Sequence, residues 1–231
     1  MNGSAKNRDR VLAAAVRLQE LVPDAVLVGG TAAALHAGHR ESLDDDHVVA
    51  DLAARFDEVL TALEATDGWI TARVKRPVMI LGSLDGVETG VRNLVRLRPL
   101  EVEEHTVGSR RLRVPTLAEM CRIKAWLCLM RNATRDYVDF AALADRMGWK
   151  AAADVVLGVD AYYADQIGSG GKRVAIQMAK QLAEPKPHDL SEIDLRSYRS
   201  LDARWHDWGA VSDVCRGVAV RALDRVVEES S

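Results

Sequence analysis

The chain has 231 residues, of which 48% are hydrophobic and 28% are charged, and its formal net charge is -3. This balance is typical of a globular protein with an apolar core. It argues against a uniformly basic nucleic-acid binder and leaves open a local basic patch. The three cysteines form no C-x-x-C pair, so neither a disulfide framework nor a zinc site is indicated, as expected in a reducing cytosol. The polar amino terminus and the lack of a long apolar run predict no signal peptide, no membrane span and a cytoplasmic location.

The first half of the chain alternates helical and strand patterns. Apolar residues at helical spacing predict a helix over 7–21, which Pro23 ends. The following patterns predict, in chain order, a strand at 25–28, a short helix at 31–37, a strand at 44–49 and an amphipathic helix at 52–65. Short β-branched runs with turn signals between them then predict further strands of the same sheet at 69–74, 78–81, 91–97, 101–107 and 112–114.

The second half is expected to be helical. Thr116-x-x-Glu119 has the spacing of a capping box, and Thr134 is expected to cap the next helix, through Met147. Further helices are predicted over 151–166, 172–182 and 211–227. The sequence therefore predicts an α+β fold with a boundary near residue 115, dividing an α/β domain (1–115) from a helical domain (116–231).

Two carboxylates are expected on one face of the strand at 44–49. Because a strand places residues i and i+2 on the same face, Asp44 and Asp46 should point together and Asp45 away from them. Two adjacent carboxylates repel each other unless a cation neutralises them. Mg²⁺ is the natural cation, because it prefers a few carboxylates together with waters and substrate phosphates, and Mn²⁺ is the alternative.

Gly29-Gly30-Thr31 precedes the short helix and suits a phosphate group. Glycines let the backbone approach closely, the start of a helix presents free N–H groups, and Thr31 adds a hydroxyl. Taken alone, a Gly-Gly pair is usually a simple turn, and Asp-x-Asp is usually an acidic surface turn. The order strand, Gly-Gly-Thr, short helix, loop and acid pair is much rarer, and it predicts a metal-dependent site for a nucleoside triphosphate.

The stretch 27–46, LVGGTAAALHAGHRESLDDD, resembles the opening of the AbiEii-type nucleotidyltransferases, a family of the DNA polymerase β-like superfamily that includes MenT-type toxins. A second stretch, RVPTLAEMCRIK at 113–124, followed by Arg131 and RDYVD at 135–139, is similar to the second block of that family. The resemblance covers roughly residues 25–147. It implies a nucleotidyltransferase-like mixed sheet flanked by helices, and transfer of a nucleotidyl group from an NTP to an acceptor hydroxyl. It also implies tRNA or another RNA as an acceptor and an antitoxin protein as a partner.

The resemblance also implies roles for individual residues. It predicts that Asp44 and Asp46 bind the metal and that Lys124 and Asp136 join them as catalytic residues, with Lys124 contributed by the helical domain. Residues predicted to bind the nucleotide are Gly29, Gly30, Thr31, Ser42 and Arg131.

Helical spacing supports a special position for Lys124, because it places this lysine within an apolar stripe with Arg131 two turns further along. The alternative for Lys124 is that its aliphatic chain packs against the apolar stripe while its ammonium group reaches water. Asp139 lies one turn from Asp136. It could equally have a structural role, as the partner of an arginine. Asp136 is preferred over Asp139 for the site.

A third carboxylate is not assigned. Enzymes of this superfamily commonly carry one on a neighbouring strand, as the base for the attacking hydroxyl. The strand predicted at 91–97 contains no acid; Asn93 stands near the expected position and Glu88 is the nearest alternative. Either Glu88, Asp136 or Asp139 completes the site, or two acids suffice, or catalysis is impaired.

Arginines suggest what the acceptor is. Arg92, Arg96 and Arg98 occupy alternate positions, so one sheet face is expected to carry three guanidiniums, as a track for a nucleic-acid backbone or as a solvated, charge-protected edge. A converging track favours an RNA acceptor. The alternatives are a small-molecule, antibiotic-type acceptor and a nucleotide-binding module whose catalysis is impaired.

Overall fold

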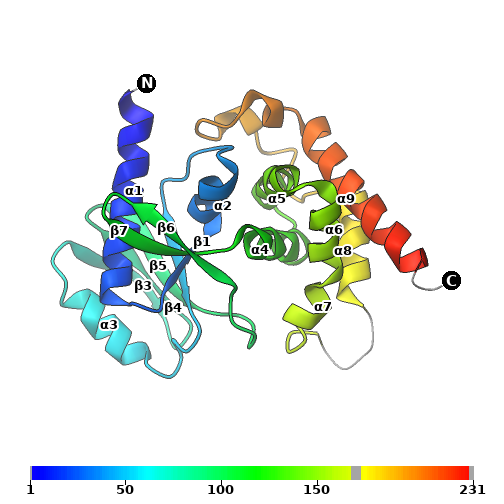
Figure 1. The fold of residues 1–231 in the computed structure, drawn as a ribbon. Helices are drawn as coiled ribbons and strands as arrows, with labels where there is room; N and C mark the ends of the chain where they lie inside the picture. Colours follow the sequence, from blue (N-terminus) through cyan, green and yellow to red (C-terminus); the bar gives the residue numbers. More distant parts are fainter. Residues whose placement is uncertain (1, 168–172, 229–231) are drawn as a thin grey trace. The chain divides into compact units, whose positions relative to one another are not determined.

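The computed structural model describes residues 2–167 and 173–228 (Figure 1). The chain divides into two compact units. Unit 1 comprises Met1–Ala32 and Glu41–Thr116, and unit 2 comprises Ala33–Arg40 and Leu117–Ser231. The class is α+β, with a mixed sheet flanked by helices in unit 1 and a helical carboxyl-terminal half.

Unit 1 is built around a five-stranded sheet in the order β1-β2-β5-β4-β3. β2 and β5 run parallel, and the other neighbouring pairs run antiparallel. The strands are β1 (Val26–Val28), β2 (Asp45–Val49), β3 (Trp69–Lys75), β4 (Met79–Leu84) and β5 (Val87–Asn93), and the flanking helices are α1 (Asn2–Leu21) and α3 (Phe56–Glu64).

The two faces of this sheet have different surroundings. Leu18 of α1 and Phe56 of α3 belong to the same buried cluster as Val49 of β2 and Val91 of β5, so both helices contribute to the core on one face. Strand alternation places Asp46 on the opposite face, and it is half-buried. The acid expected at the site therefore lies on the face away from this core.

The expectation of one continuous sheet is wrong. β6 (Val102–Val107) and β7 (Arg110–Pro115) form a separate two-stranded ribbon. The side chain of Gln19 on α1 donates to the carbonyl of Arg113 at 2.9 Å and accepts from the Arg113 N–H at 2.8 Å. This ribbon is thus hydrogen-bonded to a helix.

Several other boundaries differ from the sequence prediction, such as the start of the helix predicted at 52–65, which is Phe56, and two of these differences follow from local turns. The strand predicted at 91–97 is Val87–Asn93, since Asp85 and Gly86, both at positive φ, make a tight connection from β4 and bring the strand forward. The helix predicted at 151–166 is two helices, α6 (Trp149–Leu157) and α7 (Val159–Tyr162), separated at Gly158.

Unit 2 is helical. Helices α4 (Leu117–Met130) and α5 (Thr134–Met147) are both largely buried, and the carboxyl-terminal helix is α9 (Trp208–Glu228). The remaining elements are α8 (Val174–Ala183) and the short 3-10 helices η1 (Leu195–Ser197) and η2 (Ala203–His206). Helix α5 starts at Thr134 itself, and the carboxylate of Asp189 accepts from both the N–H and the hydroxyl of Thr134 at 2.7 Å. A distant acid thus caps this helix, rather than Thr134.

The prediction that the cysteines form no disulfide is confirmed, since Cys121, Cys128 and Cys215 are all free and buried. Within the residues that the structure describes, no helix combines the length and apolar character needed to cross a bilayer.

Candidate functional site

The glycine pair forms the first turn of helix α2 (Gly29–Ala37), rather than a turn before it. Gly29 has a φ of 74°, a conformation that glycine adopts without strain. A Cβ built on Gly29 would lie 3.3 Å from Oδ2 of Asp46 and 3.4 Å from its Cβ. The predicted phosphate-binding glycines and the predicted metal-binding acid are therefore in direct proximity within unit 1.

Asp44 is placed by hydrogen bonds and not by the alternation of a strand. β2 begins at Asp45, so Asp44 stands in the loop just before it and is exposed. Its backbone carbonyl accepts from the Thr31 hydroxyl at 2.5 Å, and its Oδ1 accepts from the Ser42 hydroxyl at 2.6 Å. Thr31 and Ser42, both predicted as nucleotide-binding residues, thus contact the acid predicted to bind the metal.

Asp45 points to the other face, as predicted from strand alternation. It is fully buried, and its Oδ1 accepts from the hydroxyl of Thr89 on β5 and lies 3.5 Å from Nδ1 of His47. The contact between Asp45 and Thr89 ties β2 to β5. The sequence predicts the direction of Asp45 but not its contacts with Thr89 and His47.

The register of β2 and β5 decides which residues of β5 share the face of Asp46. Asp46 pairs with Gly90 and Val48 pairs with Arg92, so Arg92 shares the face of Asp46. Nε of Arg92 lies 3.5 Å from Oδ1 of Asp46. Asn93 pairs with Val49 on the opposite face, and its Oδ1 accepts from the N–H of Ala53 at 3.0 Å, so it has a structural role.

Glu88 is the acid on β5 that shares the face of Asp46. It lies two residues before Gly90 and is exposed. The structure thus leaves Glu88 as a candidate for the third carboxylate and places the Arg92 guanidinium beside Asp46.

The predicted face of three guanidiniums is wrong. β5 ends at Asn93, so Arg96 and Arg98 lie beyond the strand. Arg96 is buried, and it donates to the carbonyl of Arg98 at 2.9 Å and to that of Pro99 at 3.2 Å. Arg96 therefore holds the loop after β5 and offers no exposed charge to a backbone.

In unit 2, Lys124 belongs to a buried network of charges. Its Nζ lies 2.7 Å from Oδ2 of Asp139 and 3.1 Å from Oδ1 of Asp136, and both acids are fully buried. Asp139 also accepts from Nε of Arg40 at 2.7 Å and lies 2.8 Å from Nε2 of His39. The prediction of a buried Lys124 is confirmed, and the snorkelling alternative is wrong because only 3% of the residue is exposed.

The charges in this network shift two pKa values. Burial by itself would raise the pKa of Asp139, but the charges of Lys124 and Arg40 and the hydrogen bonds from His39 and Arg40 outweigh it and hold the pKa well below its usual range. Burial would lower the pKa of Lys124, but Asp139 and Asp136 outweigh it and raise that pKa. Lys124 and Asp139 thus stay charged at neutral pH.

The expectation that Asp139 pairs with an arginine agrees with its contact to Arg40. Asp136, the acid preferred for the site, has one oxygen on Lys124 and an Oδ2 without a hydrogen-bond partner among the described residues. Arg131 does not continue the face of Lys124, because α4 ends at Met130, and it is exposed.

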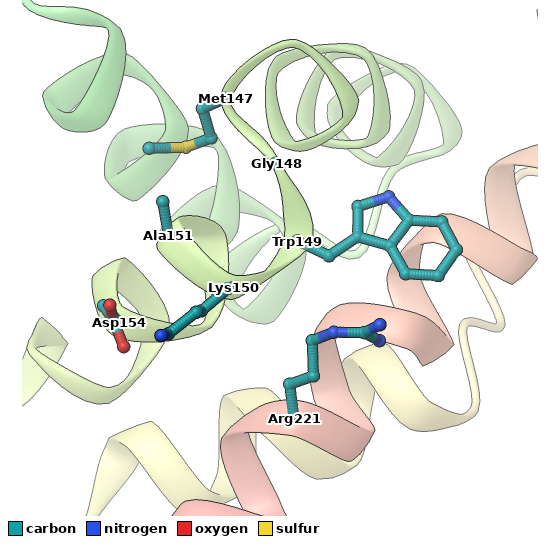
Figure 2. A pocket seen from close by; sticks show the side chains of 7 residues that line it. All are labelled: Met147, Gly148, Trp149, Lys150, Ala151, Asp154 and Arg221. Atoms are coloured by element: carbon teal, nitrogen blue, oxygen red, sulfur yellow. The ribbon is translucent and has the colours of Figure 1, made fainter.

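A hollow of about 490 Å³ lies elsewhere in unit 2 (Figure 2). It is lined by residues 147–151 together with Asp154 and Arg221, and the Arg221 guanidinium stacks over the Trp149 ring at 5.0 Å. None of the predicted site residues lines it. Within 2–167 and 173–228, no group of three or more His, Cys, Asp or Glu side chains is arranged to hold a metal ion.

The mixed sheet with its flanking helices, followed by the helical half, is a nucleotidyltransferase-like fold. A nucleotidyltransferase from H. pylori has a similar structure, with a TM-score of 0.53 and 16% sequence identity; the match covers 100% of this chain and 99% of that chain. The antibiotic-resistance factor ANT(2″)-Ia matches with a TM-score of 0.52 and 10% identity, over 70% of this chain and 95% of that chain. At these identities the likeness concerns the fold.

Sequence relatives are of a different kind. The heme uptake protein MmpL11 of Mycobacterium tuberculosis is 32% identical over 232 residues, covering 93% of this chain and 22% of the relative. The mycolic acid-containing lipids exporter MmpL11 of Mycolicibacterium smegmatis is 36% identical over 114 residues, covering 49% of this chain and 11% of the relative. The chain thus spans about a fifth or less of the length of these curated relatives. No protein-family model matches the chain, so membership of the AbiEii family stays a prediction.

Proposed function

We propose that unit 1 binds a nucleoside triphosphate together with Mg²⁺ or Mn²⁺ and transfers its nucleotidyl group to an acceptor hydroxyl. The observation that carries this proposal is the approach of Gly29 to Asp46, where a Cβ would lie 3.3 Å from the carboxylate. The absence of a side chain there leaves space beside the acid and beside the start of a helix. Such a start presents N–H groups and a positive dipole end to phosphate oxygens.

The acids fit a hard divalent cation. Asp44 is exposed, Asp46 is half-buried, and each offers carboxylate oxygens of the kind that Mg²⁺ prefers. A bound cation would neutralise the triphosphate and polarise the phosphorus that is attacked. Ser42 and Thr31 would fix the orientation of Asp44, as the second layer around a metal ligand usually does.

The roles predicted for Lys124, Asp136 and Arg131 stay predictions. Lys124 is neutralised by two buried acids, which supports a contribution to the stability of unit 2 in addition to any contact with phosphate.

For the acceptor we propose tRNA or another RNA, with an antitoxin protein as partner, because the stretch at 27–46 resembles the opening of the AbiEii and MenT-type proteins. A small-molecule acceptor of the antibiotic type is the alternative, and the missing arginine track removes one argument against it. We also propose a cytoplasmic location.

The proposal is tested by incubating the protein with each α-labelled NTP, Mg²⁺ or Mn²⁺, and either total RNA or a panel of hydroxyl-bearing aminoglycosides. We expect label to enter one acceptor class, and Asp46→Ala to reduce transfer by about 100-fold or more. Asp57→Ala is the matched control, because it removes an exposed acid of the same unit that pairs with Arg76. Transfer that is equal in wild type and Asp46→Ala would overturn the assignment of the site.

A second candidate function is a nucleotide-binding module without transfer. Two observations favour it: a guanidinium stands beside Asp46 on β5, and the sequence relatives are MmpL11 proteins of which this chain spans only a part. On this reading the chain would bind the NTP in a metal-dependent manner as a regulatory part of a transport system. Metal-dependent NTP binding by calorimetry, with no transfer to any acceptor in either metal, would favour it over the enzyme.

A further inference from the structure

Arg92 lies beside Asp46: its side chain reaches this acid from the neighbouring strand, with Nε 3.5 Å from Oδ1. We propose that this guanidinium takes the place of a second divalent cation, so that the site of Asp44 and Asp46 holds one cation for each bound nucleoside triphosphate and Arg92 contacts the triphosphate. The inference rests on the proposed function of unit 1 and specifies its metal content.

The first argument for this inference comes from the register of the sheet. β2 and β5 run parallel, with Asp46 opposite Gly90 and Val48 opposite Arg92, so the residues of β5 on the face of Asp46 are Glu88, Gly90 and Arg92. Gly90, directly beside Asp46, has no side chain, and a Cβ there would lie 2.4 Å from Cδ2 of Leu81. An acid at that position would displace Leu81.

The second argument comes from the charges. Two-metal sites place their cations about 3.5–4 Å apart and therefore need carboxylates shared between them. With Nε of Arg92 at 3.5 Å from Oδ1 of Asp46, a positive charge already lies beside a carboxylate that two cations would have to share.

The third argument comes from the environment of Arg92. Its side chain is 40% exposed, and its Nη1 lies 2.8 Å from the sulfur of Met79, a weak acceptor. The guanidinium is thus held near the acid pair without being locked in a strong ion pair. A guanidinium offers parallel N–H donors that match phosphate oxygens, so the same group can turn towards a triphosphate.

Glu88 is the residue that would contradict this inference if it bound a second cation. It lies on the same face of β5 and is exposed, so its carboxylate is free to contribute a ligand to a second cation. The experiment therefore includes Glu88→Gln.

The test counts cations by Mn²⁺ electron paramagnetic resonance and equilibrium dialysis, with a non-hydrolysable NTP analogue, on the full chain. We expect one tightly bound Mn²⁺ per bound analogue in wild type and in Glu88→Gln. Arg92→Ala should weaken analogue binding by about tenfold and leave the count at one. Arg92→Glu adds a third carboxylate and should raise the count to two. Arg73→Ala, which removes an exposed arginine from β3 of the same unit, should change neither quantity.

Two Mn²⁺ per analogue in wild type, with the second lost in Glu88→Gln, would overturn the inference and leave the proposed function standing. Unchanged analogue affinity in Arg92→Ala would overturn the contact with the triphosphate. Absence of Mn²⁺ and analogue binding in wild type would instead overturn the proposed function, and the inference with it. Circular dichroism and the melting temperature of each variant show that a changed count does not come from unfolding.

Discussion

Nζ of Lys124 lies 2.7 Å from Oδ2 of Asp139, and both side chains are almost fully buried. Breaking a buried ion pair by removing one partner typically costs about 3–5 kcal/mol, because the remaining charge stays buried without compensation. We expect Asp139→Asn to lower the free energy of unfolding by about this amount, measured by urea denaturation. The control is Asp145→Asn, which breaks the more exposed pair with Arg204 and should cost less than about 1 kcal/mol. Equal effects of the two substitutions would contradict a special role for the buried network.

The same contact predicts how stability depends on pH. The pKa of Asp139 in the folded protein lies well below the ordinary value of 3.8, so the unfolded chain binds more protons in the window between the two values. The contribution of Asp139 is therefore complete above the ordinary value and is lost as pH falls through the folded value. We expect the difference in unfolding free energy between wild type and Asp139→Asn to be constant near neutral pH and to shrink in acid. A difference that grows in acid would contradict the assigned direction of the shift.

Gly29 and Gly38 form a matched pair for testing the phosphate site. Both have positive φ, 74° and 66°, but a Cβ would meet Asp46 at Gly29 and nothing within 4 Å at Gly38. Alanine at either position should cost roughly 1 kcal/mol of stability through backbone strain. We expect only Gly29→Ala to weaken binding of a Mn²⁺–NTP complex, by about tenfold, since its methyl group crowds the carboxylate and the start of α2. Equal binding by both variants would show that the space beside Asp46 is not used.

Ser42 is expected to tune the affinity for metal through Asp44. Its hydroxyl donates to Oδ1 of Asp44 at 2.6 Å, and the loss of such an outer contact typically lowers metal affinity by about 10–100-fold. Ser42→Ala should show this loss in Mn²⁺ titrations, whereas Ser42→Thr, which keeps the hydroxyl, should restore most of the affinity. If Ser42→Ala binds Mn²⁺ as tightly as wild type, the hydrogen bond does not position a metal ligand.

The cysteines should be unreactive in the folded protein. Burial raises the pKa of Cys121 to about 12 and also raises the pKa values of Cys128 and Cys215. Because the thiolate is the reactive form, a thiol reagent at pH 8 should label none of the three cysteines in the native state and all three in denaturant. Fast labelling of any one of them in the native protein would contradict its burial in unit 2.

Much of unit 1 was predictable because its patterns are local. The buried strand before Gly29, the alternation that sends Asp45 to the core, and the Asp85-Gly86 turn each follow from a few neighbouring residues. The separation of the β6–β7 ribbon was not predictable. It depends on partners far away in the sequence, such as Gln19, whose side chain pairs with the backbone of Arg113.

The sequence by itself determined that Gly29 and Asp46 belong to one candidate site. The two residues lie on one strand–helix–strand segment, and their spacing along it brings them together. It also determined that Lys124 would be buried, since helical periodicity surrounds it with apolar residues. Only the tertiary structure decided which group stands beside Asp46. The register of two parallel strands places Arg92, and not Asn93, on the face of Asp46. A shift of one residue in that register would exchange the two, because successive side chains of a strand point to opposite faces.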